Sequence, residues 1–515
     1  MLLKAFYLPQ SLNGLEDDFE FRELEADGYR ILYPKISPEQ MKRIAETIKN
    51  TAKSVYENKD LEYLAEVIQR VRDLWMKPDY EKRKIALEIL PKLTGLSKEV
   101  IIYYQFGTIR KMDKNAVKFL ADLKFDEKVL EKFILLEGAN VWLRGYASFM
   151  NKLKLRKATK NLRRPKLVTF ITPSNVPGLI EALGVLLGVV SRTGMIIKTP
   201  SKQPVFGPMF AESLSEIDKE LGETIAVLPW KGGDRNIEDV LFRESDAVSV
   251  IGSTETALSV KRRVDELRKR GYGIKGCYHG GRFGLSVIAK EYVKREVAAL
   301  SVIDGIGYEG YMCSSPAFGF FVEDDGTGLA RKFAEYMAEE AEWITKIIPQ
   351  SDLFRKYREQ DLPKYLSLEA MGKIEVFLPE NNGCTVIFDP EPKLVPDGQN
   401  RLLKVYPIKS IFDIVQMLKP WKEYLQTIGV AVPNEKLFEF ADKVARLGVS
   451  NLRVVGTVTL PRLGESWDGN YPVLEFMLDE DYVHWVSINA KDIDAEIEKL
   501  SNNLEALREG KLISG

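Results

Sequence analysis

From Leu167 onward, short runs of apolar residues alternate with longer stretches whose apolar positions recur every three or four residues. The apolar runs contain almost no polar position, which is typical of parallel strands covered on both faces. They comprise Leu167–Ile171, Met195–Lys198, Ile225–Leu228 and Ala247–Ile251. Helices are predicted over Leu179–Val190, Phe206–Leu221, Ile237–Phe242 and Thr254–Lys269. This alternation predicts a doubly wound α/β domain over residues 161–278.

A second α/β pattern covers residues 279–450. Its predicted strands are Leu285–Ile288, Phe318–Val322, Lys373–Phe377 and Thr385–Phe388, and a helix is predicted over Glu291–Ser301. The remaining segment, 451–515, ends in apolar residues spaced by four, three, four and three positions: Ile493, Ile497, Leu500, Leu504 and Leu507. This stripe predicts a terminal helix that returns to the body of the protein, with a helical contact between subunits as the alternative.

Residues 1–160 are rich in charge and poor in glycine, and they predict a helical N-terminal region. Ser37–Gln40 is a helix start with serine as the N-cap and proline at the first helical position. Apolar residues then follow at helical spacing (Met41, Ile44, Ile48 and Ala52). The basic stretch Lys152–Lys166 ends in Arg163–Pro165 and is interpreted as a solvated linker between this region and the first α/β domain.

The composition excludes several classes of protein. The 515 residues carry 74 basic and 75 acidic side chains, and the basic stretch Lys152–Lys166 is interpreted as solvated surface in preference to a binding patch, so no nucleic-acid partner is expected. The longest apolar stretch, Val176–Val190, is interrupted by Pro177 and Glu181, so no membrane span is expected. Lys4 and Pro9 interrupt the N-terminus too early for a signal peptide. Three cysteines cannot form an even disulfide framework, and a cytoplasmic location is predicted.

Polar motifs follow the predicted strands, where ligands of parallel sheets bind. Asn175, in the proline-flanked turn Thr172–Gly178, is either an amide donor to an oxyanion or the cap of the next helix. Lys198, at the end of a strand, is either exposed or in reach of a ligand hydroxyl or phosphate. Gly252–Glu255 opens a helix, an arrangement that suits a pyrophosphate and is also an ordinary helix start. No Gly-x-Gly-x-x-Gly motif follows these strands.

Cys313 lies in the small-residue stretch Gly310–Pro316, between a predicted helix and a predicted strand. A thiolate is a strong nucleophile and suits thioester chemistry. An isolated cysteine is, however, more often a packing residue. Cys277 and Cys384 are interpreted as such packing residues, and the case for Cys313 rests on the motifs around it.

The ordered set of Pro173–Asn175, Lys198–Pro200, Gly252–Glu255, Gly280–Gly281 and Cys313 resembles the aldehyde dehydrogenase superfamily. Within it, the chain is similar to the LuxC-type acyl-CoA reductases. That likeness rests on Pro173–Gly178, Val227–Asp234, Cys313–Pro316 and Trp467–Gly469. It extends from Leu167 to Trp485 and thins between residues 325 and 450. Trp467–Gly469 is interpreted as a loop near the active site without a catalytic role.

The resemblance implies an α/β fold with two doubly wound domains, one that binds a dinucleotide and one that is catalytic. It implies that Cys313 attacks an acyl-CoA thioester of long acyl chain, that the Asn175 amide and the Cys313 N–H hold the oxyanion, and that reduction releases an aldehyde. His279 is either an acid/base or a structural hydrogen-bonding residue. The implied cofactor-binding residues are Thr172, Pro173, Ser174, Lys198, Ser201, Gly252, Ser253, Thr254, Gly280 and Gly281. No metal is predicted.

Two departures from the superfamily pattern refine this expectation. Hydrolytic members carry a glutamate two residues before the paired glycines, where this chain has Tyr278. Without that water-activating carboxylate, an acyl-enzyme is expected to meet a thiol or a hydride instead of water. NAD-preferring members often carry a glutamate where this chain has Ser201, so NADPH is favoured over NADH, with Lys198 and Lys202 as nearby charges.

Three alternatives remain. A short-chain CoA-acylating aldehyde dehydrogenase would use the same residues, a cysteine acyltransferase would use Cys313 without redox chemistry, and a non-catalytic subunit of a complex would keep the fold and bind neither nucleotide nor acyl group. The resemblance also implies a homo-oligomer, and a protein that activates or transfers the acyl group as a second type of partner.

Overall fold

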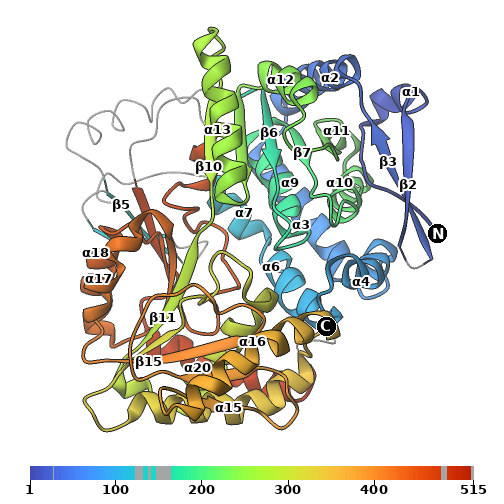
Figure 1. Cartoon of the computed structure of the whole chain (residues 1–515). Helices are drawn as coiled ribbons and strands as arrows, with labels where there is room; N and C mark the ends of the chain where they lie inside the picture. The colour runs from blue at the N-terminus through green and yellow to red at the C-terminus, as the bar shows by residue number, and fades with distance from the viewer. Residues whose placement is uncertain (27, 122–131, 137–140, 147–163, 477–483, 512–515) are drawn as a thin grey trace.

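The computed structural model describes residues 1–26, 28–121, 132–136, 141–146, 164–476 and 484–511 (Figure 1). These residues form three sheets, of three, five and ten strands. In the view of Figure 1 the five-stranded sheet (β6, β7 and β10) lies in the upper part, and the ten-stranded sheet runs from β5 at the left down to β11 and β15 in the lower part. The α/β fold predicted from the alternation of apolar runs and helices is confirmed.

The five-stranded sheet is parallel throughout and has the order β10-β9-β6-β7-β8. Its strands are β6 (Leu167–Ile171), β7 (Gly194–Lys198), β8 (Ile225–Leu228), β9 (Ala247–Ile251) and β10 (Lys275–His279). The chain moves outward from β6 in one direction through β7 and β8, and then returns to the other side of β6 as β9. The boundary between β6 and β9 is therefore a topological switch point, where ligands of such sheets bind.

Both faces of this sheet are covered by helices, as the unbroken apolar strands require. Val168 and Phe170 of β6 pack in one hydrophobic cluster with α9 and α10, while Leu167 and Ile171 pack in another with α2, α12 and α13. The covering helices are α9 (Leu179–Ser191), α10 (Phe206–Ile217), α12 (Arg235–Glu244), α13 (Thr254–Lys269) and α2 (Pro38–Glu57), with the short α11 (Lys219–Gly222) after α10. Helix α2, from the N-terminal region, thus completes one face of the sheet.

The ten-stranded sheet has the order β13-β14-β15-β12-β11-β16-β17-β18-β5-β4. Its central strands, from β14 to β18, pair in parallel, and β13, β5 and β4 add antiparallel edges. In chain order the strands are β4 (Ile134–Leu136), β5 (Val141–Tyr146), β11 (Phe283–Ile288), β12 (Phe320–Glu323), β13 (Glu375–Phe377), β14 (Thr385–Phe388), β15 (Leu402–Ile408), β16 (Leu425–Ala431), β17 (Asn451–Val454) and β18 (His484–Ile488).

The helices of this second half include α14 and α20, for which the sequence made predictions. They are α14 (Arg295–Ile306), α15 (Leu329–Ile347), α16 (Asp352–Ala370), α17 (Asp413–Leu418), α18 (Asn434–Ala445), α19 (Pro472–Glu475) and α20 (Ile493–Arg508). Helix α14 begins and ends later than predicted, because every residue from Val297 to Ile306 is buried and no polar face marks its limits. Helix α20 packs against α14 and α15, which confirms its return to the body of the protein.

The N-terminal region is not purely helical, which corrects that part of the prediction. It holds α1 (Asn13–Glu16), α2, α3 (Leu61–Met76), α4 (Glu81–Thr94), α5 (Lys98–Val100), the π-helix Ile101–Phe106, α6 (Gly107–Ile109) and α7 (Lys114–Ala121). It also holds β4, β5 and a three-stranded sheet of β1 (Leu2–Lys4), β2 (Glu20–Ala26) and β3 (Tyr29–Lys35). Nearly all of β2 is exposed, so no buried alternation marks it as a strand.

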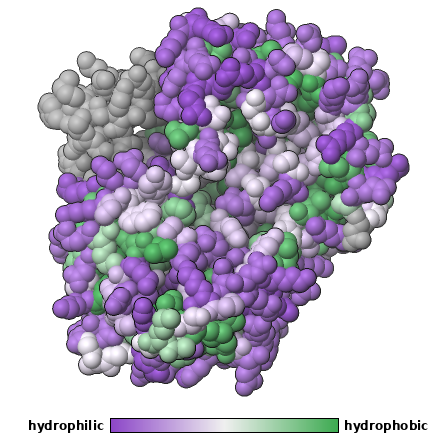
Figure 2. Space-filling view, in the orientation of Figure 1, coloured by the Kyte–Doolittle hydropathy of each residue, from purple (hydrophilic) through white to green (hydrophobic). Residues whose placement is uncertain are grey.

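The predicted domain limits at residues 160, 278 and 450 stay predictions, as does the homo-oligomer. Much of the predicted linker, residues 152–163, lies outside the described residues. The face in Figure 2 is predominantly hydrophilic, with apolar side chains in scattered groups. Within the described ranges, none of the helices combines the length and the apolar character that a membrane crossing requires.

Candidate active site

A cavity of about 880 Å³ opens where the two larger sheets meet. Its wall is formed by the carboxyl ends of β6, β7, β9 and β10 and by the amino ends of β11, β16 and β17. The residues singled out in the sequence line it, with one exception: Thr172, Pro173, Ser174, Asn175, Lys198, Ser201, Gly252, Ser253, His279, Gly280, Gly281 and Cys313. The exception, Thr254, stands behind them, where its hydroxyl accepts a hydrogen bond from the Gly281 N–H at 3.1 Å.

Cys313 is the cysteine on this wall, and its thiol is partly exposed. Cys277 and Cys384 are buried, as predicted, and Cys277 donates to the Glu475 carbonyl at 3.3 Å. Burial is the main cause that raises the pKa of the Cys313 thiol above its ordinary value, and the Asp468 carboxylate adds to the rise. The thiol is therefore largely protonated in the free protein near neutral pH.

The loop that carries Cys313 has an unusual backbone. Tyr308, Glu309 and Gly310 adopt φ values of 48°, 57° and 79°, so three consecutive residues lie in the left-handed region. For residues other than glycine this conformation is costly and persists only where surrounding contacts enforce it. A Cβ on Gly310 would come within 2.5 Å of the Gly398 carbonyl oxygen, so glycine is required there on steric grounds as well.

A buried ion pair enforces this conformation. Arg401 donates two hydrogen bonds to the Glu309 carboxylate, at 2.9 and 2.7 Å, and both side chains are fully buried. Gln350 donates to the same carboxylate at 2.9 Å, and the Asn400 N–H donates to the Glu309 carbonyl at 2.7 Å. The segment before Cys313 is thus tied to residues 400–401 through side chain and backbone.

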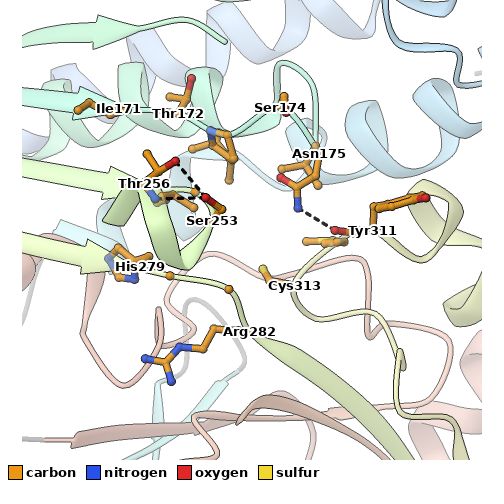
Figure 3. Close-up of a pocket in the computed structure, with 18 of the residues that line it drawn as sticks. Ile171, Thr172, Ser174, Asn175, Ser253, Thr256, His279, Arg282, Tyr311 and Cys313 are labelled. Atoms are coloured by element: carbon orange, nitrogen blue, oxygen red, sulfur yellow. Dashed lines mark hydrogen bonds between the residues drawn. The ribbon is translucent and has the colours of Figure 1, made fainter. Parts of the chain in front are cut away.

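Asn175 lies beside this loop, in the turn after β6 (Figure 3). Its side-chain amide donates to the Tyr311 carbonyl at 2.7 Å, and the second amide N–H is left for another acceptor. Asn175 does not cap the next helix, because α9 begins at Leu179 with Gly178 as its N-cap. The helix-cap alternative is therefore wrong. Within the described residues, no backbone carbonyl accepts from the Cys313 N–H, which is the second donor that an oxyanion would need.

His279, the last residue of β10, is enclosed by two carboxylates. Its Nδ1 lies 2.8 Å from Asp468 Oδ2 and its Nε2 lies 2.6 Å from Glu475 Oε1. Burial opposes the charge of the ring, but the two carboxylates outweigh it and raise the pKa of His279 to about 10. With both nitrogens bonded to acceptors, the imidazolium has no free site for proton exchange with a substrate. This geometry favours the structural interpretation of His279 over the acid/base one.

Gln426, at the start of β16, connects this charged group to the thiol. Its Nε2 donates to Asp468 Oδ1 at 2.6 Å and to Cys313 Sγ at 3.3 Å. Ionic contact with His279 and hydrogen bonds keep the pKa of Asp468 below its ordinary value despite burial. Asp468 therefore accepts hydrogen bonds on both oxygens as a carboxylate.

The other end of the cavity has features that suit a nucleotide. Lys198 is 9% exposed, and its ammonium lies 5.6 Å from the centre of the Trp230 ring and 3.4 Å from the Thr199 carbonyl oxygen. Among the described residues, none offers Lys198 a carboxylate within ion-pair distance, and burial lowers its pKa. A buried ammonium without a counterion on a cavity wall suits an anionic or hydroxyl-bearing ligand.

The start of α13 adds an anion-binding geometry to this end. Ser253 caps the helix by accepting from the Thr256 N–H at 3.2 Å, and the residues Gly252 and Ser253 face the cavity. Gly281 lies so close to this turn that a Cβ would come within 3.1 Å of Thr254 Oγ1. The wall here is backbone with free space before it, as the phosphates of a dinucleotide require. The residues present therefore fit a nicotinamide dinucleotide.

Tyr278 does not face the cavity. Its ring packs in the hydrophobic cluster under α13, and the Lys261 ammonium lies 5.9 Å from its centre. The carboxylates on the cavity wall are Glu238, Glu255 and Asp468. Of these Asp468 is linked to Cys313, and both of its oxygens are engaged, so it is a poor base toward water.

The sequence did not reveal Gln426, Glu475 or the role of Asp468. Asp468 belongs to the Trp467–Gly469 motif, which was assigned to a loop near the active site without a catalytic role. Gln426 begins a strand whose amino end faces the cavity, whereas the rule applied to the sequence concerns carboxyl ends. The sequence does contain one sign of this turn, the dipeptide Asp468-Gly469. Both residues have positive φ and form a tight turn that directs attention to Asp468.

Comparison with known proteins agrees with this site. A sequence model of the family described as acyl-CoA reductase (LuxC) matches residues 56–478. The long-chain acyl-protein thioester reductase of Photobacterium phosphoreum is 19% identical over 513 residues, covering 96% of this chain and 94% of that protein. A second reductase of this name, from Photobacterium leiognathi, is 19% identical over 506 residues and covers 96% of each chain.

Solved structures that superpose on this chain include aldehyde dehydrogenases. The methylmalonate-semialdehyde dehydrogenase of Oceanimonas doudoroffii superposes with a TM-score of 0.61 at 13% identity, covering 95% of this chain and 98% of that one. The Δ-pyrroline-5-carboxylate dehydrogenase of Mycobacterium tuberculosis superposes with a TM-score of 0.58 at 16% identity, covering 92% and 87%. These likenesses establish the aldehyde-dehydrogenase fold.

Proposed function

This chain belongs to the acyl-CoA reductase (LuxC) family, and we propose that it reduces a long-chain acyl-CoA to the aldehyde through an acyl group carried on Cys313. One observation carries the proposal. Of the three cysteines, Cys313 lines the cavity; the Gln426 amide donates to its sulfur at 3.3 Å, and the Asn175 amide donates to the Tyr311 carbonyl, two residues before it, at 2.7 Å. Both amides are donors, and they suit a reaction in which negative charge develops first on oxygen and then on sulfur.

In the first step Cys313 Sγ attacks the thioester carbonyl. A new carbon–sulfur bond forms to Cys313, the bond to the sulfur of CoA breaks, and the thiol proton of Cys313 leaves with CoA as its thiol. No oxidation or reduction occurs in this exchange of one thioester for another. The tetrahedral oxyanion is held by the second amide N–H of Asn175 and by the Cys313 N–H, whose positions are set by the Tyr311 carbonyl and the Glu309–Arg401 ion pair.

When bound, a reduced nicotinamide cofactor would supply a hydride, and the acyl group on Cys313 would become a thiohemiacetal. Lys198, Ser253 and the backbone of Gly252 and Gly281 would hold this cofactor, since they form the open, anion-binding end of the cavity. Asn175 and the Cys313 N–H stabilise the alkoxide that forms. When it collapses, the carbon–sulfur bond breaks, the aldehyde leaves, and Cys313 recovers its proton from solvent.

The product is expected to be an aldehyde and not an acid because neither Tyr278 nor Asp468 is suited to activate a water against the acyl group. Tyr278 occupies the position of the glutamate of hydrolytic relatives, and its side chain is directed into the cluster under α13. Asp468 is the wall carboxylate connected to Cys313 through Gln426, but its oxygens accept from His279 and Gln426. An acyl group on Cys313 therefore persists until the hydride is delivered.

We expect NADPH to be preferred over NADH, and two residues at this end of the cavity support that expectation. Lys198 offers a buried positive charge, and Ser201 leaves room where a carboxylate would repel a 2′-phosphate. The curated relatives are named for protein-bound acyl thioesters. A thioester on a partner protein is thus a second donor of the same chemistry, which enters the reaction at the same carbonyl carbon.

Oxidation of NADPH in the presence of acyl-CoAs from acetyl-CoA to palmitoyl-CoA tests the proposal. We expect kcat/KM to rise with chain length and the Cys313→Ala variant to be inactive. A preference for acetyl-CoA would assign a short-chain acylating aldehyde dehydrogenase. Release of CoA without oxidation of NADPH would assign an acyltransferase. The absence of both would leave a non-catalytic subunit.

A further inference from the structure

We propose that Gln426 is a catalytic residue, whose amide donates to the Cys313 sulfur and stabilises it as a thiolate both in attack and in release of the aldehyde. Asp468, His279 and Glu475 are positioning residues that hold this amide in place. The inference rests on the proposed function, because it assigns the device that makes the Cys313 sulfur a nucleophile and a leaving group. It is founded on a continuous set of contacts from Glu475 to Cys313.

The orientation of the Gln426 amide is decided by its neighbours. Asp468 Oδ1 lies 2.6 Å from Nε2 and, as a carboxylate oxygen, can only accept, so the nitrogen and not the oxygen of the amide must face it. The amide oxygen in turn accepts from the Thr427 hydroxyl at 3.3 Å. The remaining N–H is therefore directed at Cys313 Sγ, 3.3 Å away, whereas an amide rotated by half a turn would set its oxygen against the Asp468 carboxylate.

The carboxylate of Asp468 is held in turn by charge. His279 lies between Asp468 and Glu475, and Arg282 Nε lies 3.9 Å from Asp468 Oδ2. Two carboxylates thus face one imidazolium and one guanidinium, and the group is close to neutral overall. Ser249 donates to Glu475 Oε1 at 3.3 Å and so holds the carboxylate of Glu475, the member of the group farthest along the contacts from Cys313. Exposed fractions of 3%, 6% and 2% for the side chains of His279, Asp468 and Glu475 exclude water from the group.

The Cys313 sulfur receives only one side-chain donor from the described residues, and that donor is Gln426. Arg453 also lies near enough to favour the thiolate, but its guanidinium is committed to Glu465 at 2.7 Å and to the Val458 carbonyl. Asp468 acts against the thiolate by its charge. Gln426 therefore brings a donor to the sulfur while it also shields the sulfur from the carboxylate behind it.

An amide suits both steps of the reaction. It lowers the free energy of the thiolate that attacks the thioester, and of the thiolate that departs when the thiohemiacetal collapses. It has no basic lone pair of its own to take a proton from water. A histidine in this place would provide a base as well as a donor, and the acyl group would then be exposed to hydrolysis.

Alkylation of Cys313 by iodoacetamide tests the inference without substrate or cofactor, since only the thiolate reacts. The rate is followed against pH by peptide mass spectrometry, with Cys313→Ala as the blank. We expect Gln426→Glu to move the midpoint upward by more than one pH unit and to slow alkylation at neutral pH about tenfold. Gln426→Ala moves it in the same direction by less.

Gln399 provides the matched control. It also lines the cavity, but its amide donates to the Pro396 carbonyl at 3.2 Å. Gln399→Glu adds the same charge to the wall and is expected to leave the midpoint nearly where it is in the parent protein. Equal shifts in the two glutamate variants, or no shift in either, would overturn the inference.

The role of Asp468 is tested by Asp468→Ala in the same assay. Loss of the negative charge alone would lower the midpoint for Cys313, whereas loss of a positioned Gln426 raises it. We expect a rise, and a fall would contradict the positioning role. A shift in Gln426→Glu without any acyl-CoA reduction by the parent protein would retain the inference on the thiolate and reject the proposed function. If the parent protein reduces acyl-CoA but Gln426→Glu leaves the midpoint for Cys313 unchanged, the proposed function stands and the role of Gln426 is rejected.

Discussion

Glu309 and Arg401 form a fully buried ion pair with two hydrogen bonds. Glu309 is also one of three consecutive residues with left-handed backbone in the loop that carries Cys313, called the nucleophile loop below. The pair therefore links the backbone conformation before Cys313 to the strand β15, whose first residue is Leu402. Ion pairs of this kind contribute through specificity of geometry, since their desolvation offsets most of their attraction.

Removal of one partner of this pair is expected to be costly. Arg401→Met leaves the Glu309 carboxylate buried without its ion-pair partner and should lower the free energy of unfolding by about 3 to 5 kcal/mol. Chemical denaturation measures this. The matched control is Arg331→Met, which breaks the exposed pair of Arg331 with Glu375 and should cost less than about 1 kcal/mol. Equal costs for the two variants would contradict the role assigned to Glu309 and Arg401.

The charge of His279 predicts a pH dependence of stability. The pKa of His279 is raised from 6.5 in the unfolded chain to about 10 in the fold. Its contribution to stability is therefore complete below pH 6.5 and is lost as the pH rises toward 10. We expect the free energy of unfolding of the parent protein to fall across this window more steeply than that of His279→Gln. Parallel curves for the two proteins would show that His279 is not held as a cation.

Asn175 is predicted to act on the oxyanion and not on the thiol. Asn175→Ala should lower kcat/KM for acyl-CoA by about 10² to 10³-fold, the loss typical of one oxyanion donor. Alkylation of Cys313 by iodoacetamide should proceed at nearly the parent rate in this variant, because the Gln426 contact is unaffected. A parallel loss of alkylation and of reduction would instead indicate that the variant disturbs the nucleophile loop through Tyr311.

Ser201 is predicted to permit the 2′-phosphate of NADPH. Ser201→Glu places a carboxylate at that position and should raise the KM for NADPH by about tenfold or more, while the KM for NADH changes little. Steady-state kinetics with both cofactors measure the ratio. Ser201→Gln, of nearly the same size and without charge, separates repulsion from crowding. An equal effect on both cofactors would place the 2′-phosphate elsewhere.

Four strands of the five-stranded sheet could be read from the sequence almost residue by residue, because buried parallel strands are unbroken apolar runs; β10, Lys-Gly-Cys-Tyr-His and only partly buried, has no such run, and no limits were predicted for it. β6, β8 and β9 have the predicted limits, and β7 begins one residue earlier than predicted, at Gly194. The N-terminal strands could not be read in this way, since β2 is exposed along nearly its whole length and β5 is an antiparallel addition to a sheet formed much later in the chain. Pairing over such distances leaves no local pattern.

The residues of the candidate site also fall into those that the sequence could predict and those that it could not. Asn175, Lys198 and His279 follow strands whose carboxyl ends are recognisable, so they could be predicted to share one edge. Gln426 and Asp468 come from the other sheet and from a turn, and they reach Cys313 only through the meeting of the two sheets. No periodicity or spacing in the chain reports that contact.

The central claim is that Cys313 carries the acyl group between the thioester and the aldehyde. The most direct measurement incubates the protein with palmitoyl-CoA alone, locates the palmitoyl group by peptide mass spectrometry, and then adds NADPH. We predict a palmitoyl thioester on Cys313 that is discharged as hexadecanal in one turnover. A palmitoyl group on another residue, its discharge as palmitic acid, or full reductase activity in Cys313→Ala would contradict the account.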